Sequence, residues 1–156
     1  MPLDAPVAAP FSLETLGPAF AVALGEDDAG PSPAQKAFLA RVLEDFRPGE
    51  LPGVSLADLA EVLAGFWRFG AEVDGSPAVR LRRASGAHER DLGVDLLEIA
   101  QPDAPFLVDS VMGEVGDAGV EVKAMFHPMV GEGAARVSMI QVWLAPVGED
   151  RRASLI

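Results

Sequence analysis

The sequence predicts an α+β fold in which a group of helices precedes an antiparallel sheet built around a split β-α-β unit. Two observations lead to this prediction. Apolar residues recur at helical spacing in the first half of the 156-residue chain and with a period of two after Pro77. A further helical stretch near residues 105–118 separates two strand-like segments, which predicts a crossover helix between strands of one sheet.

The first 31 residues carry the weakest signals. Apolar stretches alternate there with proline, glycine and an acidic cluster at 26–28, and we expect a short helix at about Phe11–Leu24, interrupted at Gly17-Pro18. We therefore divide the chain into a flexible N-terminal segment, a helical region, an α+β domain and a tail. These four parts are residues 1–31, 32–77, 78–147 and 148–156.

Two amphipathic helices are predicted in the helical region, each with a serine at its start. Ser32 can cap the first helix, which should end before Pro48. Ser55 and Asp58 form a capping-box pattern at the start of the second, which should end near Gly70. The apolar stripes are Phe38, Leu39, Val42, Leu43 and Phe46 in the first helix and Leu56, Leu59, Ala60, Leu63, Phe66 and Trp67 in the second.

The first strand is predicted at 79–83, where Arg80 and Arg82 alternate with Val79 and Leu81. This alternation is typical of an edge strand with a charged outer side. We expect those arginines to face water.

Three further strands complete the predicted sheet. The segment 94–100 is mostly apolar on both sides, which is typical of an interior strand. The segments 120–127 and 137–145 flank a glycine-rich turn and should form a hairpin. Because β-α-β crossovers are right-handed, and the last strand can insert between two parallel ones, we predict one particular order. That order is 79–83, 94–100, 137–145, 120–127.

The composition limits the partners and the chemistry. The chain carries 12 basic against 24 acidic residues, a formal net charge of -12, so its field repels phosphate backbones and anionic lipid. We expect neither a nucleic-acid nor a membrane partner. The lack of cysteine excludes disulfides, thiol nucleophiles and Cys-ligated metals. With no bilayer-length apolar run and no signal-like start, we expect a cytoplasmic protein.

Few residues are candidates for catalysis or metal binding. His127 could act as an acid or base with Asp109 to orient it, but no nucleophile or second base follows at a recognisable spacing. We therefore favour a strand-end histidine that bonds to backbone or water. The His88-Glu89-x-Asp91 sequence could form half a metal site, although one histidine among loop acids is usually solvated. We predict no catalytic residue and no metal ligand.

The Gly131-x-Gly133-x-x-Arg136 sequence resembles a dinucleotide fingerprint only superficially. The bulky Arg136 stands where a small residue must allow a helix to approach a strand, and the segment joins two predicted strands. We expect a turn, and no cofactor bound to this chain.

Several short motifs resemble the N-terminal region of bacterial large NAD-specific glutamate dehydrogenases. The motifs are Pro102-Asp103-Ala104-Pro105-Phe106-Leu107-Val108-Asp109-Ser110-Val111, Gly119-Val120-Glu121-Val122, Phe126-His127-Pro128, Leu56-Ala57-Asp58-Leu59 and Phe66-Trp67-Arg68-Phe69. The resemblance covers roughly residues 40–146. The segment 84–93 departs from the family pattern.

The resemblance implies an ACT-like, ferredoxin-like domain in a multidomain oxidoreductase that oxidises glutamate with NAD to 2-oxoglutarate. NAD would then bind in a catalytic region far downstream, and this chain would be a non-catalytic regulatory and assembly module. Its expected partners are the remaining domains of the parent chain and further copies in a homo-oligomer. On this interpretation residues 148–156 are the tail of an excised fragment.

The alternative is an amino-acid-sensing ACT-type domain. In many ACT domains the loop before the crossover helix holds effectors, and here that loop is Asp103, Ala104, Pro105 and Phe106. Asp103 could instead only cap the helix, which we favour, because Phe106 stands where many ACT domains have glycine. An independent enzyme that uses His127 and Asp109 is our third hypothesis.

A candidate contact face lies on the side of the sheet away from the crossover helix. Met125, His127, Met139 and Trp143 should share it. Such a stripe is usually core, packed here against the N-terminal helices. Contact with another subunit or domain is the alternative.

Overall fold

The helices and strands occur in the order that the sequence predicts. The computed structural model describes residues 11–25, 30–47, 51–72, 76–102, 107–131 and 136–148. The elements are α1 (Leu13–Ala23), α2 (Pro33–Asp45), α3 (Leu56–Ala71), β1 (Ala78–Ser85), a 3-10 turn (Ala87–Glu89), β2 (Asp91–Pro102), α4 (Leu107–Asp117), β3 (Val122–Phe126), β4 (Met129–Val130) and β5 (Val137–Leu144). The α+β fold class is confirmed.

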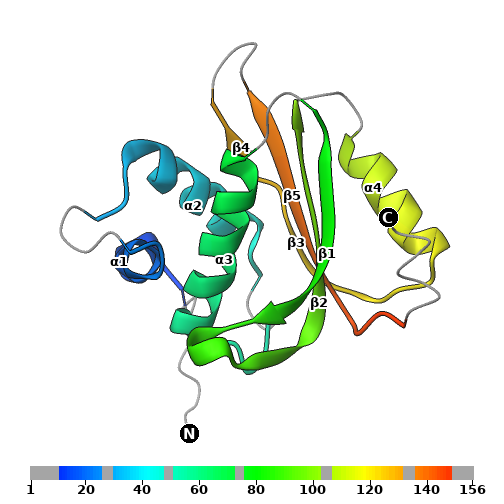
Figure 1. Ribbon diagram of the computed structural model, residues 1–156, viewed down its shortest axis with the longest axis horizontal. Helices are drawn as coiled ribbons and strands as arrows, with labels where there is room; N and C mark the ends of the chain where they lie inside the picture. The colour runs from blue at the N-terminus through cyan, green and yellow to red at the C-terminus, as the bar shows by residue number, and fades with distance from the viewer. Residues whose placement is uncertain are drawn as a thin grey trace, which may run out of the picture.

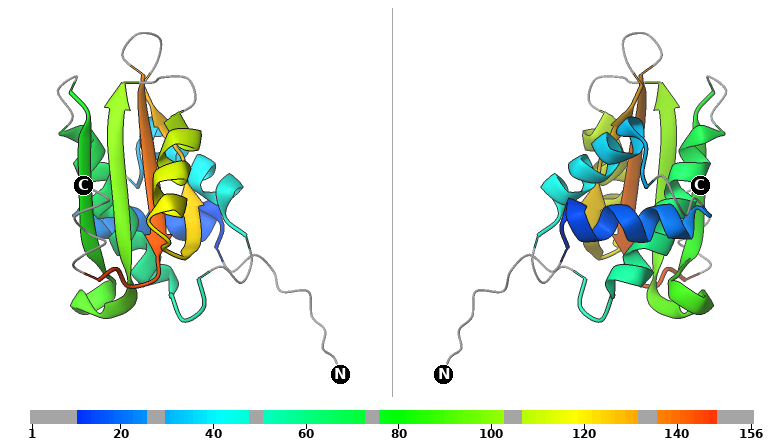
Figure 2. Two further views of the ribbon diagram at one scale, coloured as in Figure 1. Left: turned by 90° about the vertical axis from the view of Figure 1, so that its right-hand side faces the viewer. Right: turned by 90° about the vertical axis from the view of Figure 1, so that its left-hand side faces the viewer.

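The sheet separates two layers of helix. The helices α1, α2 and α3 cover one face and α4 covers the other (Figure 1, Figure 2). Each side has its own hydrophobic cluster: Phe38 and Phe66 belong to the first, and Val115 and Ile140 belong to the second. We call the first side the helix-layer face and the second the α4 face.

The strand order is β1-β2-β5-β3, and β4 pairs with β5. Every pairing is antiparallel, so β2 and β3 run parallel on either side of β5. This confirms the predicted order, with the hairpin strand inserted between the two strands that α4 connects. The two-residue strand β4 lies in the segment that the sequence left between its last two predicted strands.

Capping boxes define where α2 and α3 begin. The hydroxyl groups of Ser32 and Ser55 accept hydrogen bonds from the amides of Gln35 and Asp58, each at 3.1 Å. Each of these partners returns a bond through its side chain to the serine amide. Both predicted caps are therefore confirmed, and they fix the start of the two helices that lie closest to the sheet.

The predicted N-terminal helix is present as α1, but the interruption expected at Gly17-Pro18 is wrong. The helix runs without interruption from Leu13 to Ala23 through Pro18. Phe20 is 0% exposed, and its ring centroid lies 5.9 Å from that of Phe38 and 6.3 Å from that of Trp67. Burial of this apolar face outweighs the poor helix propensity of the Gly-Pro pair, which is why the local signal was misleading.

A bulge in β3 reverses which side its second half faces. The register shifts between Val122 and Ala124, so Lys123 is an extra residue in the strand. Because side chains alternate between the faces, this extra residue sends Ala124 and Phe126 to the helix-layer face and Met125 to the α4 face. Met125 was expected on the helix-layer face instead, because the sequence prediction assumed unbroken alternation.

Candidate functional site

The predicted effector loop lies outside the described residues. Asp103, Ala104, Pro105 and Phe106 connect the end of β2 to the start of α4. Amino-acid binding at this loop stays a prediction.

Two members of the predicted contact face lie inside the chain. Met139 is 1% exposed and Trp143 is 0% exposed, and both pack in the hydrophobic cluster of the helix-layer face. The ring of Phe126 lies edge-on to Trp143, with centroids 6.4 Å apart. The chain's own helices therefore cover this part of the face. Grouping Met125 with these residues was wrong, because the bulge places it in the α4 cluster.

A buried carboxylate lies at the centre of the helix-layer face. The side chain of Glu98 is 0% exposed, and it accepts hydrogen bonds from Arg80 Nε at 2.5 Å and from Arg82 Nε and Nη2 at 2.8 and 3.0 Å. Gln141 Nε2 donates to the same carboxylate at 2.7 Å. The amide oxygen of Gln141 in turn accepts from Trp143 Nε1 at 2.9 Å. We call these five residues the Glu98 cluster.

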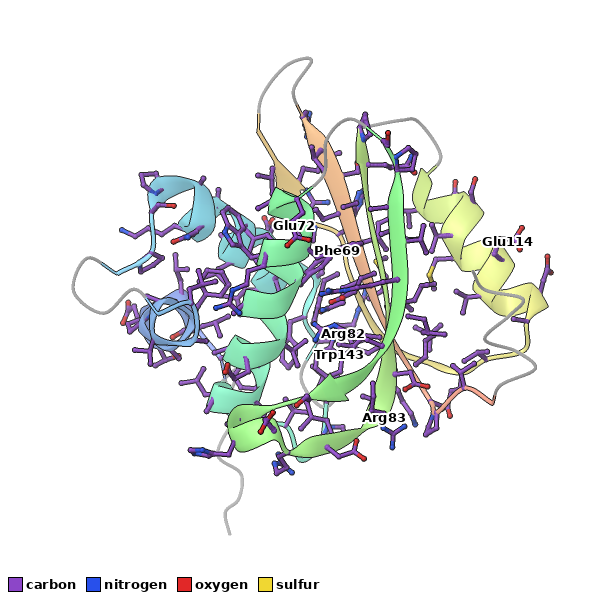
Figure 3. The ribbon with its side chains drawn as sticks, viewed as in Figure 1. Phe69, Glu72, Arg82, Arg83, Glu114 and Trp143 are labelled. Atoms are coloured by element: carbon purple, nitrogen blue, oxygen red, sulfur yellow. The ribbon has the colours of Figure 1, made fainter. Side chains whose placement is uncertain are left out.

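The two arginines also bind the backbone of α3. Arg82 Nη2 donates to the carbonyl of Val62 at 3.2 Å, and Arg80 Nη2 donates to that of Gly65 at 3.1 Å. The guanidinium of Arg80 lies 4.5 Å from the ring centroid of Phe69. Figure 3 shows Phe69 and Arg82 between α3 and the sheet. The cluster therefore fixes α3 on β1 and β2.

The prediction that Arg80 and Arg82 of the first strand face water is wrong. The edge position of this strand is confirmed, but Arg80 and Arg82 face α3 and are only partly exposed. A signal was present in the sequence, since Glu98 is the one acidic residue within the apolar run 96–100 and is the direct cross-strand partner of Arg80. A buried carboxylate in an interior strand needs such a cation next to it.

A second polar cluster joins the start of α3 to the turn between β1 and β2. Asp58 is 1% exposed; its carboxylate accepts from the amide of Ala87 at 2.9 Å and from the guanidinium of Arg90. Arg90 Nη2 also donates to the carbonyl of Gly53 at 2.9 Å. A Cβ at Gly86 would lie 2.4 Å from Asp58 Oδ1, so a side chain there would collide with this carboxylate. The segment 84–93, which departs from the family pattern, is thus tied to the cap of α3.

These contacts change the acidity of Asp58. Burial raises its pKa, but the hydrogen bonds from Arg90, Ser55 and Ala87 outweigh that effect and lower the pKa to about 2. The carboxylate is therefore ionised and bonded at neutral pH. A group held in this way fixes structure and does not exchange protons near neutrality.

Comparison with known protein families shows which family this chain belongs to. The model of the family described as "Glutamate dehydrogenase, ACT1 domain" matches residues 38–141, about two thirds of the chain. The chain belongs to the glutamate dehydrogenase ACT1 domain family. The predicted relationship to glutamate dehydrogenase is confirmed at this level. No curated protein and no solved structure matched the chain.

The His-Pro motif of this ACT1 domain is engaged through its backbone. The amide of His127 donates to Asp45 Oδ2 at 2.8 Å, and the carbonyl of Pro128 accepts from the amide of Met139 at 2.9 Å. Asp109 lies on α4, across the sheet from α2 and its Asp45 (Figure 1). The bond to Asp45 involves the backbone amide of His127, so the hypothesis that Asp109 orients its side chain stays a prediction.

Asp91, the first residue of β2 after the β1–β2 turn, forms an ion pair with Arg83. Asp91 accepts from Arg83 Nε and from the amide of Gly93, both at 2.9 Å, and the bond from Arg83 lowers the pKa of Asp91. Within the described ranges, no group of three or more histidine and acidic side chains is placed to hold a metal ion. Likewise, no helix in the described part of the chain is long and apolar enough to cross a membrane.

The glycine-rich segment of the ACT1 domain joins β4 to β5. Gly131, its first residue, has a φ of 89°, which a glycine adopts without strain. Gly131 and Arg136 lie between two strands, as predicted, whereas Gly133 lies outside the described residues.

Proposed function

We propose that this chain is the non-catalytic regulatory and assembly module of a larger, bacterial, NAD-specific glutamate dehydrogenase. The observation that carries the proposal is the ACT1 family match over residues 38–141. The parent enzyme would oxidise glutamate to 2-oxoglutarate and ammonia, and NAD would bind in a catalytic region outside this chain. The partners would be the other domains of the parent chain and further copies of it in the cytoplasm.

The polar clusters support a non-catalytic role. Glu98 and Asp58 are buried carboxylates of the kind that can carry acid-base chemistry, yet Glu98 accepts from Arg80, Arg82 and Gln141, and Asp58 accepts from Arg90 and the amide of Ala87. Both clusters connect α3 to the sheet or to the β1–β2 turn. Their geometry favours a rigid support over a reaction centre.

Two measurements test the proposal. Calorimetric titration of the chain with NAD should give no binding, and glutamate with NAD should give no NADH; micromolar NAD affinity would overturn the proposal. Deleting the module from the parent enzyme should leave NAD binding intact and change the oligomeric mass or the response to effectors. Loss of NAD binding in that deletion would place part of the active site here.

The second candidate function is amino-acid sensing at Asp103, Ala104, Pro105 and Phe106. The position of this loop favours it, because the loop leads directly into α4, and a helix start attracts carboxylates. Calorimetry with a panel of amino acids tests it. Saturable binding that Asp103→Ala removes without unfolding the chain would support sensing, and no binding across the panel would exclude it.

A further inference from the structure

A pocket opens beyond the last paired residues of β2 and β5. The pairing ends at Asp95 and Leu144, and past that point lies a cavity of about 270 Å³. It sits at the opposite end of β2 from the loop that leads into α4, so it is separate from the predicted effector loop. Segments that are distant in sequence form its walls. The residues that matter here are Val54, Leu92, Val94, Lys123, Trp143 and Ala145.

The walls of this pocket are mainly apolar. Val54, Leu92 and Val94 contribute aliphatic surface, and Trp143, which is itself 0% exposed, lies directly behind these residues. The indole N–H of Trp143 already donates to Gln141, so it is not available to a ligand. A molecule bound against these walls would place a hydrocarbon group there.

One charge lines the pocket. Among the described lining residues, Lys123 alone has a charged side chain. It is the bulge residue of β3, and bulges commonly redirect a side chain. Its ammonium lies 3.4 Å from Glu121, and the two side chains are 39% and 68% exposed. Such an exposed pair is weak, so a ligand anion can replace Glu121.

We propose that this pocket binds a small apolar carboxylate, with its hydrocarbon chain against Leu92 and Val94, close to Trp143, and its carboxylate on Lys123. A volume of about 270 Å³ is slightly below the roughly 300 to 1,000 Å³ of pockets for drug-sized ligands, which suits a smaller ligand of about eight non-hydrogen atoms. None of the described lining residues is acidic, and the carboxylate of Glu121 near Lys123 is 68% exposed, so an α-ammonium group would lose hydration inside the pocket without gaining a buried partner. The ligand class is therefore a fatty or similar carboxylic acid and not an amino acid.

This site is additional to the proposed function and does not depend on it. The deletion in the parent enzyme tests the regulatory module, whereas the site is tested by binding to the chain itself. Either proposal can fail alone.

Hexanoate is the probe, and the indole N–H resonances in a nitrogen-correlated NMR spectrum are the readout. The chain has two tryptophans, and Trp67→Phe identifies which resonance belongs to Trp143. Hexanoate should shift the Trp143 resonance saturably, with a dissociation constant on the order of 1 mM for eight atoms. Hexanamide and norleucine, which share the chain but lack the net negative charge, should bind at least about tenfold more weakly.

Lysine variants supply the matched control. Lys123→Met should weaken hexanoate binding about tenfold, while Lys36→Met, which changes the only other lysine and lies on α2, should leave it unchanged. Ala145→Leu should fill the pocket and abolish the shift; if that variant does not fold, the lysine pair decides. The proposal is overturned by no saturable shift at ten times the expected constant, by equal binding of hexanamide or norleucine, or by equal effects of the two lysine variants.

Discussion

Opposite sides of the same two strands are buried by different means. On the α4 face, the centre of β2 and β5 presents Leu97, Ile99, Ile140 and Val142 to apolar residues of α4. On the helix-layer face, the intervening residues Glu98 and Gln141 are also 0% exposed. The arginines of β1 and the side chain of Gln141 donate hydrogen bonds to Glu98, and the indole of Trp143 donates one to Gln141. The α4 face is held by transfer of hydrocarbon from water. The helix-layer face adds directional bonds, which specify where α3 lies but make that face sensitive to the loss of any one partner.

The largest expected effect comes from Trp143→Lys. This change removes a fully buried indole and leaves an unpaired ammonium beneath the helices, so the free energy of unfolding should fall by about 3 to 5 kcal/mol or more. Thermal melting with sedimentation checks this. Val22→Lys, at a side chain that is 64% exposed on α1, is the control and should change stability by less than about 0.5 kcal/mol. An unchanged melt with a smaller particle mass would instead mean that a second chain covers Trp143.

Glu98→Ala should lower the free energy of unfolding by about 3 kcal/mol, somewhat less than Trp143→Lys. The loss is smaller because the unpaired Arg80 and Arg82 keep partial access to water. Urea unfolding measures the loss. Glu114→Ala, on the outer side of α4 (Figure 3), should change stability by less than about 0.5 kcal/mol. Replacing Glu98, Arg80 and Arg82 together by apolar residues should recover much of the loss. If the single change costs under 1 kcal/mol, the cluster is solvated and the contrast between the two faces fails.

The Asp58 contacts predict a pH dependence that the apolar α4 face lacks. Its pKa is about 2 in the folded chain against an ordinary value of 3.8, so its contribution is present above pH 3.8 and is lost as the pH falls towards 2. That contribution is up to about 2 kcal/mol. Asp58→Asn should therefore destabilise the chain at pH 7 and matter little at pH 2, as judged by urea unfolding at each pH. Asp117→Asn on α4 is the control. A constant difference across this range would show that Asp58 acts through something other than its charge.

The smallest expected effects concern two helical glycines with opposite surroundings. A Cβ at Gly113 in α4 would meet nothing within 4 Å, so Gly113→Ala should stabilise the chain by about 0.5 to 1 kcal/mol through helix propensity. A Cβ at Gly65 in α3 would lie 3.1 Å from Arg82 Nη2, which is already bonded to Val62 and Glu98. In Gly65→Ala the steric contact with Arg82 should therefore outweigh the gain in helix propensity, and the free energy of unfolding should fall by about 1 kcal/mol. Equal melting shifts for both variants would show that Arg82 moves aside freely.

The structure confirms less of the site predictions than of the fold predictions, and particular residues show why. The pattern placed Trp143 and Met139 on the face away from the crossover helix, with core packing as one alternative, and the structure buries both there. The arginines of β1 were expected in water, because an alternating charged edge strand normally faces solvent. The carboxylate of Glu98 and two backbone carbonyls of α3 bind them on the inner side instead. The partners of Asp58 include Arg90, 32 residues away, in the segment 84–93 that departs from the family pattern.

The sequence by itself determined the order and type of the elements, the caps of α2 and α3, and the order of the strands. These features follow from signals within a few residues, namely serine caps and apolar periods, together with a general rule of handedness. Only the tertiary structure decided which way Met125 faces, what Glu98 binds and how the β1–β2 turn joins α3. These outcomes depend on one extra residue at Lys123 and on partners such as Gln141, which is 43 residues from Glu98. A period of two cannot reveal a bulge, and a local pattern cannot show which polar groups meet when two layers close.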